Sequence, residues 1–134
     1  MTDLLLDTSA YASFLAGHPE VGAAVRQAGR VVLTPVVLGE LLAGFRRGRQ
    51  RARNEGHLRA FLAAPRVEVV PVDDETAVRY AVILDALRAA GTPIPTHDIW
   101  ISASAMRHGL SVLTTDAHYQ KVAQVITLYH APLP

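Results

Sequence analysis

The chain has no cysteine among its 134 residues. Disulfide scaffolds, thiol chemistry and zinc sites built on cysteine are therefore excluded, whereas the redox compartment stays open because a missing thiol is compatible with either state. Half of the residues are hydrophobic, which at this length is enough to bury a continuous core without metals or disulfides. We therefore expect a single domain over residues 1–134.

Long hydrophobic runs are also lacking. The apolar run Leu4–Leu6 has no basic leader and is far too short for a secretory signal. The longer apolar stretch 31–45 is interrupted by Pro35, Gly39 and Glu40. It falls short of the roughly 20 apolar residues that a membrane-spanning helix needs. We expect a cytoplasmic protein that is not associated with a membrane.

Lysine is nearly absent, since Lys121 is the only one among 13 basic residues. The net charge of +1 favours neither a nucleic acid nor a membrane partner, but the positive charge is concentrated in one segment that contains a single acid, Glu55. Its basic residues are Arg46, Arg47, Arg49, Arg51, Arg53 and Arg59. Two interpretations stay open: a solvated helix face, or contact of the first five guanidinium groups with RNA phosphates. Acidic residues of a protein partner could use the same surface.

The remaining pattern is an alternation of strands and helices. Five short β-branched or leucine-rich runs predict strands at 4–6, 31–33, 67–70, 112–113 and 125–128. Helical spacing separates them, most clearly over 74–90, and such alternation predicts a parallel α/β sheet flanked by helices. Thr34-Pro35 should begin one helix, Thr96 should cap another that ends at Gly109, and Gly91 should end the long helix.

Two carboxylates follow predicted strands directly. Asp7 comes after Leu4–Leu6, and Asp116 lies just past Val112-Leu113. In a parallel α/β sheet the carboxyl ends of the strands face a common crevice where ligands bind. We therefore expect these two acids to lie close together.

Two further acids lie on predicted helices. Glu40 falls within the apolar arc of the helix that starts at Pro35, so it should face inward, where an ionised carboxylate needs a cation or a metal. Asp98 lies in the first turn of an almost wholly apolar helix. It has an equally acceptable explanation as a charge that complements the helix dipole.

Four converging carboxylates would repel one another strongly without a counter-ion. A hard divalent cation such as Mg²⁺, or Mn²⁺, takes oxygen ligands and can activate water against a phosphodiester, so the predicted chemistry is phosphoryl hydrolysis. The six histidines show no metal-ligand spacing, which argues against zinc and favours surface or helix-end roles for them, with His97 the exception worth following.

Four segments make the chain resemble the PIN-domain ribonucleases, in particular the toxin subunits of VapBC-type toxin-antitoxin pairs. They are Leu5-Leu6-Asp7-Thr8-Ser9, Thr34 to Gly44, Thr92 to Asp98, and Leu113-Thr114-Thr115-Asp116. The resemblance spans nearly the full length and implies a three-layer PIN-like fold. It departs at His97, where the family frequently has asparagine before the third acid, which puts the local hydrogen bonding in doubt but not the acid.

The resemblance implies a divalent-metal-dependent endoribonuclease that acts as the toxin of a type II pair. It assigns catalysis and metal binding to the four acids, with the first and third as the direct ligands: Asp7, Glu40, Asp98 and Asp116. Supporting positions would be Thr8, Ser9, His97 and Thr114. The implied partners are RNA, a cognate antitoxin and a second copy of the chain.

Two other classes of protein share parts of this pattern. A phosphoryl-accepting response regulator would need adjacent acids after its first strand and a lysine at a late strand end, and neither is present. The stronger alternative is an inactive PIN-like binding module that acts only through its antitoxin complex. Such a module would be expected to lack one of the four acids, and this chain has them all.

Overall fold

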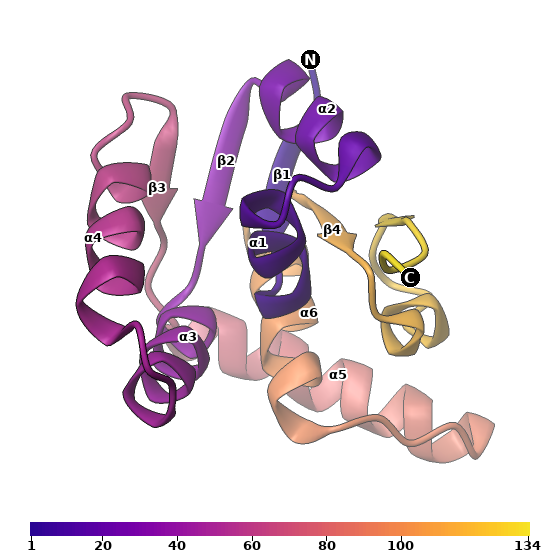
Figure 1. The fold of residues 1–134 in the computed structure, drawn as a ribbon. Coiled ribbons are helices and arrows are strands. Elements are labelled where there is room, and N and C mark those ends of the chain that lie inside the picture. The colour runs from indigo at the N-terminus through magenta and orange to yellow at the C-terminus, as the bar shows by residue number, and fades with distance from the viewer.

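A computed structural model describes residues 1–134 as a sheet of five strands between layers of helices (Figure 1). The strands are β1 (Asp3–Leu6), β2 (Arg30–Leu33), β3 (Val67–Val69), β4 (Ser111–Thr114) and β5 (Thr127–Tyr129). Their order in the sheet is β3-β2-β1-β4-β5, and every neighbouring pair is parallel. The predicted parallel α/β sheet of about five strands is confirmed.

Helices occupy both sides of this sheet. The two after β1 are α1 (Thr8–Leu15) and α2 (Pro19–Gln27), on the near face in Figure 1, while α5 (Asp74–Ala90) and α6 (Thr96–His108) lie behind it. Beside β2 and β3 lie α3 (Pro35–Arg47) and α4 (Arg51–Leu62), and the 3₁₀ helix η1 (Ala117–Lys121) follows β4. Because helices cover both faces, the central strand residues Leu5, Val32 and Val112 are fully buried.

Helix boundaries follow local chemistry. The Thr34 side chain accepts a hydrogen bond from the Val37 amide and caps α3, as predicted. Gly91 and Gly109 end α5 and α6 with φ of 67° and 66°, a left-handed conformation that glycine adopts without strain. The expected Thr96 cap is wrong: Pro95 occupies the N-cap position and Thr96 is the first helical residue, so its side chain makes no capping bond.

The fifth strand lies later than predicted. Pairing with β4 runs from Thr127 to Tyr129, whereas the prediction was 125–128. Val125 instead packs against the core from the preceding turn, and a backbone bond from the Val112 amide to the Ile126 carbonyl precedes the ladder. Val125 is therefore apolar because it packs against the core, and it does not pair in a strand. No helix has the combination of length and apolarity that crossing a membrane would require.

Candidate functional site

The carboxyl end of β1 places Asp7 at the start of α1. Its side chain is only 3% exposed and caps the helix by accepting a hydrogen bond of 2.8 Å from the Ala10 amide. The hydroxyl groups of Ser9 and Thr114 donate to the same carboxylate at 2.8 and 2.7 Å. Asp7 is therefore fixed in one orientation from three directions.

Thr114 joins the ends of the two central strands. Its hydroxyl donates to Asp7 and accepts a 2.9 Å hydrogen bond from the Asp116 amide, while the Thr115 amide donates to the Ser9 hydroxyl at 3.1 Å. These bonds hold Asp116, the N-cap residue of η1, beside Asp7. The expectation that the acids after β1 and β4 lie close together agrees with this arrangement.

Asp98 is buried in the first turn of α6, with 3% of its surface exposed. The Tyr119 hydroxyl donates to Oδ1 at 3.0 Å, and Oδ2 has no hydrogen-bond partner. A helix-capping carboxylate would accept from backbone amides of α6, and this one accepts from none. Asp98 therefore does not cap α6 by a hydrogen bond, although its place in the first turn is one where a negative charge complements the helix dipole.

Glu40 reaches the cleft from α3. The Thr8 hydroxyl donates to Oε1 at 2.7 Å, and His97 Nε2 lies 3.3 Å from Oε2. The side chain is 31% exposed, so the prediction that it faces the core is wrong. The buried stripe of α3 consists of Val37 and Leu41, and Glu40 lies at its margin, where the helix borders the cleft.

Two histidines flank the acids. His97 Nε2 is 3.2 Å from Asp98 Oδ1, and His118 Nδ1 is 3.1 Å from Asp116 Oδ1 and 3.5 Å from Asp98 Oδ2. Sequence reasoning singled out His97 but missed His118 and Tyr119. The available signal was their spacing, because residues two and three after Asp116 fall within one turn of the 3₁₀ helix that Asp116 caps.

The four acids and His97 line one cleft of about 270 Å³. Its lining contains all four predicted acids and three of the predicted supporting residues: Asp7, Thr8, Ser9, Ala12, Glu40, His97, Asp98, Asp116 and Tyr119. The remaining supporting residue, Thr114, lies beneath it and is fully buried. The structure thus brings together eight positions that the sequence distributes from residue 7 to residue 116.

Burial governs the charges in the cleft. Desolvation raises the pKa of Asp7 from its ordinary 3.8 to about 6, against the opposing effect of its hydrogen bonds, and the nearby Asp116 raises it further. Desolvation also raises the pKa of Asp98, although the hydrogen bond from Tyr119 lowers it. The pKa of Tyr119 is raised well above its usual value by burial and by the acids around it, so its hydroxyl stays protonated and donates.

The residues present fit a divalent cation. Asp98, Asp116 and His118 each offer one ligand atom within 4.8 Å of the others. The unpartnered Asp98 Oδ2 is a buried anionic oxygen, which is costly unless a cation or hydrogen bond satisfies it. The donor set is mainly carboxylate oxygen, which suits Mg²⁺ and Mn²⁺.

The five arginines predicted to contact RNA lie between the end of α3 and the start of α4, and all five are exposed. Arg51 pairs with Glu55 one turn later, whereas the others make no ion pair. Arg47 follows Glu40 by seven residues on α3, which places it on the same helix face about 10 Å along the axis. The arginine segment therefore lies outside the cleft, on the surface that extends from Glu40 along α3.

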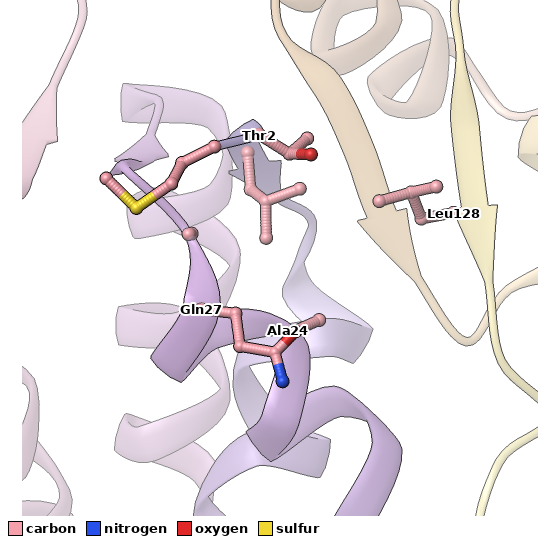
Figure 2. A pocket seen from close by; sticks show the side chains of 7 residues that line it. Thr2, Ala24, Gln27 and Leu128 are labelled. Carbon is pink, nitrogen blue, oxygen red and sulfur yellow. The ribbon is translucent and has the colours of Figure 1, made fainter.

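A second hollow of about 280 Å³ lies at the opposite, amino end of β1 (Figure 2). Thr2, Ala24, Gln27 and Leu128 are among its lining residues. It contains no carboxylate, histidine or arginine side chain. The chemistry of the molecule is thus concentrated at the carboxyl end of the sheet.

Comparison with known proteins finds a match to one protein family. The family described as "PIN domain" matches residues 4–125. Ribonuclease VapC4 of Mycobacterium tuberculosis is 33% identical over 95 residues, covering 69% of this chain and 73% of that protein. Ribonuclease VapC5 of the same organism is 30% identical over 112 residues, covering 84% and 82%. A crystal structure of VapBC-5, a member of the VapBC family of toxin-antitoxin systems from M. tuberculosis, superposes with a TM-score of 0.78 at 28% identity, covering 97% of this chain and all of that one.

Proposed function

Because the chain belongs to the PIN-domain family, as a relative of the VapC ribonucleases, we propose that residues 1–134 form one domain that cleaves RNA internally with a divalent metal, Mg²⁺ or Mn²⁺. The catalytic and metal-binding residues of this proposal are Asp7, Glu40, Asp98 and Asp116. The observation that carries it is the convergence of these four carboxylates, from four separate elements, on one cleft.

The roles of the four acids in metal binding follow from how deeply each is buried. Asp7 and Asp98 are the most buried of the four acids and have raised pKa values, so a cation stabilises their ionised forms most strongly. We assign them as the principal ligands. Glu40 and Asp116 complete the pocket, and Asp116 is close enough to Asp98 to bind the same ion. When bound, a divalent ion would polarise the phosphodiester and lower the pKa of water.

The other residues hold these acids in place. Thr114 and Ser9 donate to Asp7, Thr8 donates to Glu40, and the Tyr119 hydroxyl orients Asp98. Fixed carboxylates keep the charge distribution of the site prepared before RNA arrives, which reduces the reorganisation needed during reaction. The arginine segment next to α3 would attract the RNA backbone toward an otherwise acidic cleft.

The relatives also suggest a biological setting. VapBC-5 is a complex within a toxin-antitoxin family, so we assign this chain as the toxin of such a pair, acting in the cytoplasm. An antitoxin that presents a basic side chain to the four carboxylates would neutralise the cleft and exclude RNA. Expression of this chain without its antitoxin should therefore arrest growth, and the arrest should require intact acids.

The inactive binding module is not favoured. That alternative predicts a degraded site, whereas all four acids face the cleft and Thr8, Ser9, Thr114 and Tyr119 hold three of them by hydrogen bonds.

The direct test is cleavage of RNA by purified, metal-stripped protein to which Mg²⁺ or Mn²⁺ is restored, compared with the Asp7→Asn variant. We expect metal-dependent cleavage that leaves 5′-phosphate and 3′-hydroxyl ends, and none with the variant. Asp85→Asn is the matched control, because Asp85 is an exposed acid of α5 that does not line the cleft. Sequencing of RNA ends after induced expression would identify the target in cells. Cleavage that persists in excess EDTA, or products with 2′,3′-cyclic phosphates, would refute the proposal.

A further inference from the structure

We propose that His118 is a metal ligand through Nδ1, together with Asp98 and Asp116, and that this nitrogen makes the site select Mn²⁺ over Mg²⁺. The inference rests on the proposed function, because Asp98 and Asp116, the two carboxylates beside His118, line the proposed active-site cleft. It goes beyond the four carboxylates by adding a ligand of different chemistry and by choosing between the two cations.

The distances around His118 are those of ligands that share one ion. His118 Nδ1 is 3.1 Å from Asp116 Oδ1 and 3.5 Å from Asp98 Oδ2. Two neighbouring ligands of an octahedral ion, each about 2.1 Å from it, lie about 3 Å apart. The ring nitrogen and the two carboxylates are therefore already spaced to surround a cation.

A buried oxygen points to a missing partner at the same place. Asp98 Oδ2 has no hydrogen bond, whereas Oδ1 of the same carboxylate accepts from the Tyr119 hydroxyl. The Asp98 side chain is only 4% exposed, so water does not readily satisfy the free oxygen. The oxygen closest to His118 is thus the one left available for a metal.

The backbone prepares His118 for this role. Its amide donates to Asp116 Oδ1 at 2.9 Å, which fixes the first turn of η1 and keeps the imidazole beside the Asp116 carboxylate. The side chain is 46% exposed, so the nitrogen can be reached from solvent without opening the core. In the tautomer that carries its proton on Nε2, the imidazole presents the lone pair of Nδ1 to the carboxylates and can coordinate a metal.

Nitrogen ligation has a consequence for metal choice. Mg²⁺ strongly prefers oxygen ligands and retains its waters, whereas imidazole nitrogen favours first-row transition ions. The other donors here are carboxylates, which suit Mn²⁺ among those ions. A site with one histidine and several carboxylates should therefore bind Mn²⁺ in preference to Mg²⁺.

His97 provides the matched control. Its Nε2 also lies near Asp98, at 3.2 Å, but from Oδ1, the oxygen that Tyr119 already occupies. Its side chain is 48% exposed, nearly the same as that of His118. The two histidines have similar exposure, but His97 approaches Asp98 Oδ1 and Glu40, whereas His118 approaches Asp98 Oδ2 and Asp116.

The experiment is pulsed EPR on full-length protein loaded with Mn²⁺, combined with Mn²⁺ and Mg²⁺ binding measurements. Nitrogen modulation of the Mn²⁺ signal is expected in the wild type and in His97→Gln, and should be lost in His118→Gln. The ratio of Mn²⁺ to Mg²⁺ affinity should fall by at least about tenfold in His118→Gln and stay unchanged in His97→Gln. Wild-type protein labelled with ¹⁵N-histidine should show the modulation of ¹⁵N in place of ¹⁴N, a measurement that needs no substitution.

The outcomes separate this inference from the proposed function. If Mn²⁺ binds without nitrogen modulation, or if only His97→Gln removes the modulation, the assignment of His118 is wrong and the carboxylate site stands. If neither cation binds the wild type, the proposed metal-dependent activity is wrong as well.

Discussion

Replacing Asp7 with asparagine should stabilise the metal-free protein at neutral pH while removing its activity. Burial raises the pKa of Asp7 from 3.8 to about 6 in the folded chain. The folded state therefore binds this proton more tightly than the unfolded state does. The resulting stability is fully present below the unfolded pKa and is lost as pH rises through the folded value.

The size of the effect follows from those two values. A rise from 3.8 to about 6 corresponds to about 3 kcal/mol of folding free energy that the wild type loses between about pH 4 and pH 7. Asparagine carries no charge, so the variant does not lose this folding free energy as pH rises. Asparagine replaces one carboxylate oxygen with an amide nitrogen that cannot accept hydrogen bonds. The lost bonds cost about 1 kcal/mol each, and that cost does not change with pH. The raised pKa of Asp98 contributes to both proteins and largely cancels in their difference.

Urea denaturation in EDTA at a series of pH values would measure this difference. The free energy of unfolding of Asp7→Asn relative to wild type should grow by about 3 kcal/mol across that range, whereas Asp85→Asn should follow the wild type throughout. Divalent metal should restore much of the wild-type loss, because it binds the ionised folded site. A difference that stays flat with pH would show that Asp7 ionises in the fold as readily as in the unfolded chain, and the argument from burial would fail.

Three other variants test separate parts of the site and of the arginine segment. Asp98→Asn should leave the metal-free protein at least as stable as wild type in thermal melts while cutting RNA cleavage severely; a large drop in melting temperature would instead make Asp98 a structural residue. Tyr119→Phe removes the donor to Asp98 Oδ1, so it should cost about 1–3 kcal/mol of stability and weaken metal binding measured by calorimetry, and wild-type affinity would contradict this. Arg46→Ala combined with Arg47→Ala should lower the slope of RNA affinity against salt by roughly two without altering sequence preference, and an unchanged slope would identify the segment as a solvated surface.

The sequence predicted the elements whose signals are local. The strands up to β4, the caps at Thr34, Gly91 and Gly109, and the meeting of Asp7 with Asp116 all follow from short-range patterns together with the geometry of parallel sheets. The boundary of β5 was wrong because an apolar residue such as Val125 can be buried in a turn as well as in a strand.

The finer arrangement of the cleft depends on how helices pack, which the sequence does not encode locally. Helical spacing placed Glu40 among the apolar residues of α3. Whether Glu40 then faces the core or the cleft depends on how α3 packs against the sheet, and in the structure it lines the cleft. His118 and Tyr119 were missed because a 3₁₀ turn has no distinctive periodicity over five residues. Their place at the site follows from the packing of η1 against α6.

The Thr114 hydroxyl, which links Asp7 to Asp116, also determines when the active site can form during synthesis of the chain. Asp7 and Thr114 are separated by 107 positions, and β4 pairs with β1 at the centre of the sheet. A ribosome that has not yet made residues 111–116 carries a chain without its fourth acid and without the strand that orders the first. Competence therefore requires that residues 111–116 have been made and that β4 has paired with β1, so an antitoxin can meet the complete cleft only after that step.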